Sequence, residues 1–527
     1  MNPTNLIYTD KMTNSTTLSV PELLQSAVQL HRQGQLAQAN GIYAQILQIS
    51  PGHFDALHFS GVIAKQTGQP EKAMELISAA INLYRSEFNA GHASAFCNLG
   101  AACQECSQPG LAVSHYQTAI RLKPDYAMAH NNLGNALKNL GRHHEALASY
   151  RNAIRFAPDY PEAFYHCGLV LHLIGQFEEA LPYFERALQI RPAYAQACNA
   201  MGISLHSLGR YADAVDYYSR AIELMADFAQ ACFNRGISYN RLRSFDQAVA
   251  DFESAIAYQP NYPNAWFYLG NSLRQLNKTE LAIAAYQRAR ELGAAPDQID
   301  FLLATLGAGA MPKAPPAAYV SELFDQYADH FDVHLTQVLQ YAVPELISTT
   351  LAPHLQNGPV DCLDLGCGTG LCAGFLRRHA GSLTGVDLSQ NMLEQAARLN
   401  LYDDLVCAEI TDFLFRSGQQ FDLITAADVL VYLGDLNQLM QGVARVLRAH
   451  GLFCFSVEHF NNDGHGTDYI LQTTARYAHS ADYLRQLAQQ HGLTLIEMHQ
   501  HTGRQENQNS SEALIVLLQK VAGKQQV

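Results

Sequence analysis

The residues best suited to chemistry lie where an apolar run ends in a cluster of glycines. The run Val360–Leu365 predicts a buried strand of a parallel sheet; it contains Asp364 and leads directly into GCGTG (366–370). Glycines in a turn between a strand and a helix let the backbone come within contact distance of a ligand. The G-x-G-x-G spacing differs from the G-x-G-x-x-G of dinucleotide-binding folds, and the absence of a G-x-x-x-x-G-K motif excludes a phosphate-binding P-loop.

A second acidic residue stands at the end of the next apolar run. Ser382–Val386 ends in Asp387, and a carboxylate at the tip of a second strand can bind both hydroxyls of a ribose. Further apolar runs, separated by amphipathic helical stretches, end near Glu409, Asp428 and Glu458. This alternation predicts a doubly wound α/β sheet. Ligands of such sheets lie beyond the carboxyl ends of the strands, where all of these acidic residues fall.

The N-terminal part of the chain repeats itself every 34 residues. One column of the repeat holds glycine from Gly100 to Gly270, and other columns hold alanine, an aromatic residue, a second alanine and, in most units, a closing proline. Such a unit predicts two antiparallel helices that small residues allow to approach closely, with the aromatic residue filling the space between neighbouring pairs. Because no pair buries its apolar face alone, about eight units over residues 20–305 are expected to stack into a solenoid.

The composition changes between the repeats and the glycine-rich segment. Residues 306–318 are rich in Gly, Pro and Ala, which predicts a linker. Aromatic residues from Tyr319 to Phe331 then return at roughly helical spacing and predict either a helix that packs on the next domain or a lid over a ligand pocket. The expected divisions are a disordered N-terminus (1–19), the solenoid (20–305), the linker (306–318), an α/β domain (319–521) and a tail (522–527).

Both parts of the chain resemble known families. The 34-residue columns resemble the tetratricopeptide repeat. The segments DLGCGTG (364–370), GVDLS (385–389) and FDLITAADVLVYLGDL (421–436) resemble the class I methyltransferases that depend on S-adenosylmethionine (SAM). Two further stretches, LFDQYADHFD (323–332) and YAHSADYL (477–484), are similar to a bacterial group of such enzymes that carries N-terminal repeats.

These resemblances imply a multidomain fold. An all-α tetratricopeptide solenoid would be followed by a Rossmann-like, doubly wound α/β domain over about residues 319–520. The methyltransferase fold also implies two last strands, at Thr494–Met498 and Ala513–Leu518, with the final one antiparallel.

The methyltransferase resemblance implies SAM as the cofactor. Asp364 is expected at the methionine moiety and Asp387 at the ribose hydroxyls, while Cys367 fits the tight bend as a small residue. The family often has Asp where Glu409 stands, so Asp412 either takes the adenine role itself or only caps a helix. The whole implied set of cofactor-binding residues is Asp364, Gly366, Cys367, Gly368, Gly370, Asp387, Leu388, Met392, Glu409 and Ile410.

Methyl transfer from a sulfonium requires little covalent participation by the protein, because the methyl group is already activated. The protein must align the acceptor with the sulfur–methyl bond and exclude water, and it needs a base only when the acceptor carries a proton. The candidates for this role are Asp428, Tyr432 and His459, with Glu458 beside them, and a structural hydrogen bond is the alternative for each. No spacing typical of metal ligands or of a Cys or Ser nucleophile is present.

Two segments are candidates for covering the substrate. His330 and His334 lie in the aromatic segment that can form a lid, and from there either is a further candidate for the base. Arg504 and Glu506 lie in the polar stretch Gln500–Ser511, for which an exposed hairpin loop is the alternative.

The repeats predict a groove for a protein or peptide. Asn98, Asn132 and Asn234 share one place on the first helix of their units, two residues before the glycine. In some repeat proteins, asparagines at this place hold a peptide backbone, and the alternative is an ordinary polar position on an exposed face.

The bulk composition narrows the class of protein. A formal net charge of -14 argues against a dedicated nucleic-acid binder. No apolar run is long enough to span a bilayer, the N-terminus lacks the apolar core of a secretion signal, and the 11 cysteines are scattered, so a reducing cytoplasmic setting is expected. The sequence thus predicts a SAM-dependent methyltransferase whose repeats bind a partner or substrate. The alternative is an interaction scaffold that binds SAM without efficient turnover.

Overall fold

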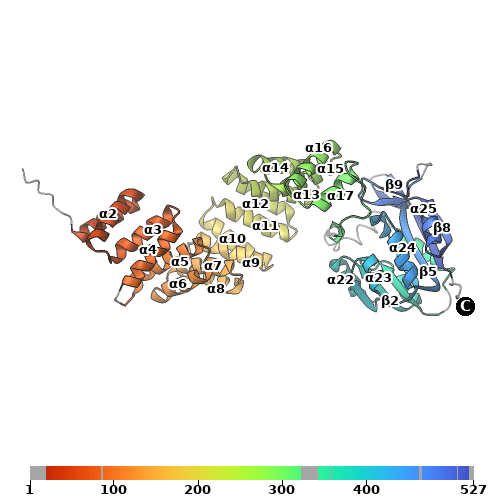
Figure 1. Cartoon of the computed structure of the whole chain (residues 1–527), viewed down its shortest axis with the longest axis horizontal. Coiled ribbons are helices and arrows are strands. Elements are labelled where there is room, and N and C mark those ends of the chain that lie inside the picture. The colour runs from red at the N-terminus through yellow and green to blue at the C-terminus, as the bar shows by residue number, and fades with distance from the viewer. Residues whose placement is uncertain are drawn as a thin grey trace, which may run out of the picture. The chain divides into compact units, whose positions relative to one another are not determined.

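The chain is described here from a computed structural model (Figure 1). It divides between Tyr258 and Gln259 into two compact units. The predicted disorder of the N-terminus and tail, and the candidates His330 and His334, concern positions outside the described residues. Those residues are 19–84, 87–317, 319–321, 324, 342–355, 358–461, 466–506 and 509–521, with the backbone alone for 502–506 and 509–511.

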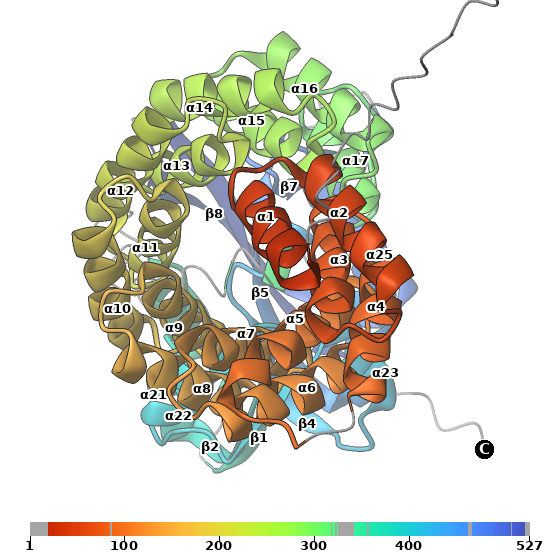
Figure 2. The same ribbon diagram turned by 90° about the vertical axis from the view of Figure 1, so that its left-hand side faces the viewer.

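The described part of the first unit is helical throughout. Consecutive helices pair in antiparallel fashion, and each pair contacts the next, so that the helices of this unit wind into a superhelix (Figure 2). Together with the short η1 (Ala90–His92), they are α1 (Val20–Arg32), α2 (Leu36–Ile49), α3 (Phe54–Gln66), α4 (Pro70–Leu83), α5 (Ala93–Glu105), α6 (Pro109–Leu122), α7 (Ala127–Asn139), α8 (His143–Phe156), α9 (Pro161–Leu173), α10 (Phe177–Ile190), α11 (Ala195–Ser207), α12 (Tyr211–Leu224), α13 (Ala229–Arg241) and α14 (Phe245–Tyr258).

The glycine and aromatic columns of the repeat meet inside each helix pair. A Cβ atom built on Gly134 of α7 would lie 2.5 Å from Cε1 of Tyr150 of α8, and one on Gly168 of α9 would lie 2.6 Å from Cε1 of Phe184 of α10. The aromatic ring therefore occupies the space that a side chain on the glycine would take. The ring of Tyr150 also lies 5.3 Å from that of His166 in α9, so the aromatic residue packs within its own pair as well as between neighbouring pairs.

This contact predicts a cost for any side chain at the glycine position. We expect Gly134→Ala to lower the free energy of unfolding by about 1–3 kcal/mol, because the ring of Tyr150 is fully buried and must move. The matched control is Gly110→Ala in α6, where an added Cβ meets nothing within 4 Å. Chemical denaturation of both variants checks the difference, and equal midpoints would contradict the packing argument.

The second unit begins with three helices and continues into the sheet domain. The helices are α15 (Pro263–Gln275), α16 (Thr279–Glu291) and α17 (Pro296–Thr305), and α20 (Val343–Leu351) precedes the first strand. Among the described residues of the whole chain, no helix has the length and apolar character needed to cross a membrane.

The sheet has the strand order β3-β2-β1-β4-β5-β7-β6, with β9 also paired to β5 and β8 paired to β9. β1 pairs in parallel with β2 and β4, whereas β9 runs antiparallel to β5. The parallel strands therefore end at one edge of the sheet. The strands are β1 (Val360–Leu365), β2 (Ala380–Asp387), β3 (Asp404–Cys407), β4 (Phe421–Ala426), β5 (Leu447–His459), β6 (Tyr469–Leu471), β7 (Tyr477–His479), β8 (Leu493–Glu506) and β9 (Asn509–Lys520).

Helices cover both faces of this sheet. Successive side chains of a strand point to opposite faces of the sheet and so belong to different hydrophobic cores, as Cys362 and Leu363 of β1 show. Cys362 packs with residues of α20 and α21 (Ala373–His379), whereas Leu363 packs with residues of α23 (Ile410–Arg416), α24 (Asn437–Val446) and α25 (Ala481–Gln490). The predicted all-α solenoid followed by a doubly wound α/β domain is thus confirmed.

The end of the chain differs from the sequence expectation in one respect. The two last strands are present and β9 is antiparallel to its neighbours, but both are longer than predicted. The polar stretch Gln500–Ser511, considered as a loop, is mostly strand, since β8 reaches Glu506 and β9 begins at Asn509. Main-chain pairing in a hairpin does not require apolar side chains, so the polar sequence gave no indication of these strands.

The Gly/Pro/Ala-rich segment after α17 is held against the sheet domain. The carbonyl of Lys313 accepts hydrogen bonds from the backbone N–H groups of Gly434 (2.8 Å) and Asp435 (3.2 Å). The phenol of Tyr477 donates to the carbonyl of Pro312 at 2.8 Å, and the Lys313 ammonium pairs with Asp435 at 2.8 Å. These bonds give the segment a defined path along the domain.

Candidate functional site

The glycine turn after β1 adopts backbone conformations that favour glycine. Gly366 and Gly368 have φ values of +63° and +55°, in the left-handed region. A Cβ atom on Gly366 would lie only 2.1 Å from Cγ2 of Val429, which leaves no room for another residue. The turn therefore depends on glycine both for its backbone angles and for its packing.

Asp364, just before this turn, is almost completely buried. Its carboxylate accepts hydrogen bonds from the phenol of Tyr402 (2.8 Å) and the hydroxyl of Thr425 (2.9 Å). Burial raises the pKa of Asp364 to about 6, although both hydrogen bonds lower it. This carboxyl group therefore titrates close to neutral pH.

Asp387 stands at the tip of β2, beside the glycine turn. Its Oδ2 atom accepts a hydrogen bond from the backbone N–H of Gly368 at 2.9 Å, and its Oδ1 atom accepts one from the N–H of Ser389 at 2.9 Å. The parallel register of β1 and β2, in which Leu365 lies opposite Val386, brings the two strand ends together. The two amides fix the orientation of the carboxylate.

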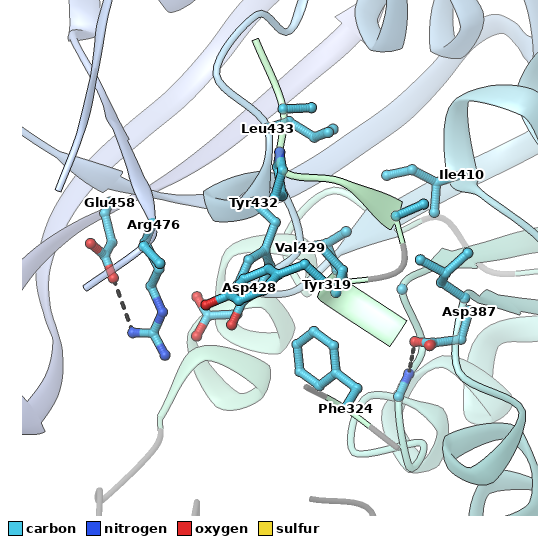
Figure 3. A pocket seen from close by; sticks show the side chains of 18 of the residues that line it. Tyr319, Phe324, Asp387, Ile410, Asp428, Val429, Tyr432, Leu433, Glu458 and Arg476 are labelled. Carbon is cyan, nitrogen blue, oxygen red and sulfur yellow. Dashed lines mark hydrogen bonds and ion pairs between the residues drawn. The ribbon is translucent and has the colours of Figure 1, made fainter. Parts of the chain in front are cut away.

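A cavity of about 1240 Å³ extends along the carboxyl edge of the strands (Figure 3). This exceeds the roughly 300–1,000 Å³ of a typical site for one small molecule. Gly370 and His459 are not among its lining residues. The residues singled out from the sequence that do line it are Tyr319, Phe324, Asp364, Gly366, Cys367, Gly368, Asp387, Leu388, Met392, Glu409, Ile410, Asp412, Asp428, Tyr432 and Glu458.

The walls of this cavity are rich in acidic groups. The described lining contains three basic side chains, Arg274, Lys313 and Arg476. Against them stand seven carboxyl groups, those of Asp364, Asp387, Glu409, Asp412, Asp428, Asp435 and Glu458. An excess of carboxylates in a cleft favours a ligand with net positive charge.

Glu409, and not Asp412, caps the helix α23. Glu409 is the N-cap of α23, and its carboxylate accepts the backbone N–H of Asp412 at 2.8 Å. Asp412 lies in the first turn of that helix and pairs with Arg416 at 3.3 Å. The helix cap considered for Asp412 is therefore provided by Glu409.

The end of the cavity away from Asp387 combines acidic, basic and aromatic side chains. Arg476 and Glu458 form an ion pair at 3.2 Å with 16% and 9% of their side chains exposed. Burial would lower the pKa of Arg476, but the neighbouring Tyr432, Glu458 and Asp428 raise it and keep the guanidinium charged. The Phe324 and Tyr432 rings lie 5.3 Å apart, and Figure 3 places them between Asp387 and the Arg476–Glu458 pair.

Asp428 lies between β4 and β5 in an unusual backbone conformation. Its φ is +56°, which is uncommon for residues other than glycine and best tolerated by Asp and Asn. Its backbone N–H donates to the hydroxyl of Ser456 at 2.7 Å, and that hydroxyl donates to Oδ1 of Asp428 at 3.1 Å. These hydrogen bonds with Ser456 fix the backbone and the carboxylate of Asp428 at the wall of the cavity.

His459 is placed away from the cavity. Its Nδ1 atom lies 3.2 Å from the carbonyl of His479, and its Nε2 atom lies 3.2 Å from the Asn461 side chain. β5 continues to His459, and because side chains alternate along a strand, Glu458 faces the cavity while His459 does not.

Neither of the two arginines in the described cavity lining was singled out from the sequence. Arg476 lies in the turn between the three-residue strands β6 and β7, which are too short to show a periodic pattern. Arg274 lies on α15, within the repeat region, where nothing in the columns distinguishes it from a surface residue.

The three asparagines of the repeats bridge neighbouring units. The side-chain amide of Asn98 lies 3.0 Å from His58 Nε2, that of Asn132 donates to Cys97 Sγ at 3.8 Å, and that of Asn234 donates to Asn199 at 3.0 Å. Each bond reaches the first helix of the preceding unit, so these amides also have a structural role.

Comparison with known families matches both parts of the chain. A family profile described as "Methyltransferase domain" matches residues 363–455. Profiles described as "Tetratricopeptide repeat" match residues 30–93, 125–193, 168–227 and 233–299. No group of three or more His, Cys, Asp or Glu side chains suited to a metal ion occurs among the residues with described structure.

Individual relatives match the C-terminal part. The chain is 27% identical over 151 residues to a ubiquinone biosynthesis O-methyltransferase of Coxiella burnetii, which corresponds to 26% of this chain and 64% of that protein. It is 30% identical over 135 residues to the protein of the same description from Thiobacillus denitrificans, or 23% of this chain and 56% of that one. The chain thus spans less than two thirds of the length of either relative.

Among solved structures, the tetratricopeptide repeat protein YrrB is 24% identical, with a TM-score of 0.31 over 36% of this chain and 96% of YrrB. The family profiles, together with the two kinds of fold, identify the chain. It joins an array of tetratricopeptide repeats to a domain of the methyltransferase family.

Proposed function

We propose that the chain is a class I, SAM-dependent methyltransferase whose catalytic domain spans residues 319–521. The observation that carries the proposal is the carboxylate of Asp387, held by the amides of Gly368 and Ser389 at the cavity edge where β1 and β2 end. This is the place where doubly wound sheets bind the ribose of a nucleoside.

The charge of the lining and the volume of the cavity suit SAM. SAM carries a sulfonium and an ammonium group, which suit the acidic walls. Asp387 would bind the ribose hydroxyls and Asp364 the methionine end, while Met392 and Ile410 offer apolar contacts for adenine. The volume of 1240 Å³ leaves room for an acceptor beside the cofactor.

When bound, SAM supplies an activated methyl group, and the residues of the chain position the acceptor. We propose a hydroxyl acceptor, because the curated relatives are described as O-methyltransferases. A hydroxyl nucleophile must lose its proton, and Asp428 is the proposed general base, since it lines the cavity next to Tyr432 and is oriented by Ser456. The Phe324 and Tyr432 rings would exclude water from the acceptor.

The repeats are proposed to bind a protein partner or a protein substrate in their groove. Asn98, Asn132 and Asn234 are the proposed contacts, and their bonds to the preceding unit would hold them in a row for this purpose.

Labelled SAM tests the reaction and identifies the class of acceptor. The chain is incubated with methyl-labelled SAM and cell lysate, and the products are separated into protein and small-molecule fractions. A labelled product in either fraction supports the proposal. Binding of SAM without any labelled product would instead favour the alternative function, an interaction scaffold that binds SAM without efficient turnover.

The raised pKa of Asp364 predicts how SAM binding depends on pH. With a pKa of about 6, Asp364 is mostly protonated at pH 5 and mostly ionised at pH 7 in the ligand-free chain. A cationic ligand favours the ionised form, so affinity should rise with pH and be about tenfold higher at pH 7 than at pH 5. Calorimetry between pH 5 and pH 7 measures how the affinity for SAM changes with pH. Asp364→Asn should flatten this dependence, and a wild-type affinity that falls as the pH rises would contradict the assignment.

A further inference from the structure

A basic side chain from the repeat region reaches the cavity. Arg274 lies near the end of α15 and lines the cavity together with Gln275, Asn277 and Thr279. Its Nε atom is buried without a hydrogen-bond partner, and no carboxylate pairs with Arg274 within the described part of the chain. Because Arg274 lines the cavity and no carboxylate of the described residues pairs with it, its positive charge is available to an anionic ligand.

The position of Arg274 is fixed by the packing of the helices that follow it. The ring of Phe301 in α17 lies 5.1 Å from that of Tyr319 and packs with Ala475 and Tyr477 of the sheet domain. α16 contacts both α15 and α17, so this small apolar cluster ties α15 to the cavity.

Arg274 differs in its surroundings from the other arginine of the cavity. Arg476 is neutralised by Glu458 and lies close to Asp428. Arg274 lies beside phenols instead. Burial, the largest effect, raises the pKa of both Tyr286 and Tyr319, whereas the charge of Arg274 lowers both, and its side-chain hydrogen bond to Tyr286 lowers that pKa further. A neutral phenol does not cancel the charge of a guanidinium as a carboxylate does, so the charge of Arg274 remains to attract an anion.

We propose that the methyl acceptor carries an anionic group, a carboxylate or a phosphate, which Arg274 binds. The guanidinium matches the planar fork of either group. Arg274 is thus a specificity-determining residue that the repeat region contributes to the catalytic cavity. The proposal rests on the methyltransferase function, because it assigns the anion to the acceptor and not to the cofactor.

Matched small probes test this assignment on the full chain saturated with S-adenosylhomocysteine. Benzoate and benzamide have nearly the same shape, and their ring suits the Phe324 and Tyr432 walls, but only benzoate is charged. Phenyl phosphate distinguishes phosphate from carboxylate. We expect benzoate or phenyl phosphate to bind about tenfold more tightly than benzamide, as one charged hydrogen-bonded pair would provide. Ligand-observed NMR titration measures the three affinities.

Variants show whether Arg274 is responsible. Arg274→Gln should abolish the preference for the anion, whereas Arg274→Lys, which keeps the charge, should retain part of it. The control is Arg288→Gln on α16, an exposed arginine paired with Glu291 at 2.7 Å, which should leave the preference unchanged. Unaltered melting and S-adenosylhomocysteine binding show that each variant is folded.

Two results would overturn the inference while the methyltransferase function stands: equal binding of benzoate, phenyl phosphate and benzamide by the wild type, or an anion preference that persists in Arg274→Gln. Failure of the wild type to bind S-adenosylhomocysteine, measured first, would overturn the proposed function together with the inference.

Discussion

Replacing Asp387 by alanine should weaken SAM binding by at least about 100-fold. The carboxylate is proposed to accept hydrogen bonds from both ribose hydroxyls, and hydrogen bonds to a charged group contribute about 1.5–3 kcal/mol each. The variant also removes the acceptor of the Gly368 and Ser389 amides, which orient the glycine turn, so the loss includes disorder at the rim of the cavity. Calorimetry with SAM and with S-adenosylhomocysteine measures the affinities.

The control for this variant is Asp404→Ala. Asp404 begins β3, is exposed and does not line the cavity. Its removal changes the net charge by the same amount, so any general electrostatic effect on a cationic ligand appears in both variants. An Asp387→Ala chain that binds SAM as well as the Asp404→Ala chain would refute the ribose assignment.

Asp428→Asn should lower the turnover number by about 100- to 10,000-fold, the range that a positioned general base contributes. Asparagine has the same shape and tolerates the φ of +56°, so the backbone at this position is preserved while the base is lost. Because Asp428 is proposed to act on the acceptor, the affinity for SAM should not change. Methyl transfer to the acceptor found with labelled SAM is the measurement.

A second variant separates the loss of the proposed base from the loss of its orientation. Ser456→Ala removes the hydroxyl that orients Asp428 but leaves the carboxylate in place, so its turnover should fall between those of the wild type and Asp428→Asn. Full activity in Asp428→Asn at all pH values would show that the acceptor needs no base from this residue.

Much of the fold was predictable because each column of the repeat has one packing role. The contact between Gly134 and Tyr150 has an equivalent in each of the other well-formed units. The 34-residue period of the sequence therefore corresponds to a contact that repeats in the structure. The sheet was predictable for a similar reason, since buried parallel strands are continuous apolar runs. The acidic residues Asp364 and Asp387 stand at strand ends, and a sheet of this kind brings such ends to one edge.

Other parts of the site depend on geometry that no local pattern encodes. The strand β5 continues to His459, and the alternation of side chains directs Glu458, not His459, into the cavity. Arg476 enters from a turn between two very short strands, and Arg274 enters from a helix that belongs to the repeat region. Their places are set by tertiary packing, such as the contact of Phe301 with Tyr319.

A crystal structure of the chain grown with S-adenosylhomocysteine tests the central claim most directly. The account predicts the ligand at the ends of β1 and β2, with its ribose hydroxyls on the Asp387 carboxylate and its methionine end towards Asp364. Density for the ligand elsewhere, or a cavity edge at Gly366 and Gly368 that stays closed to it at saturating concentration, would contradict the account.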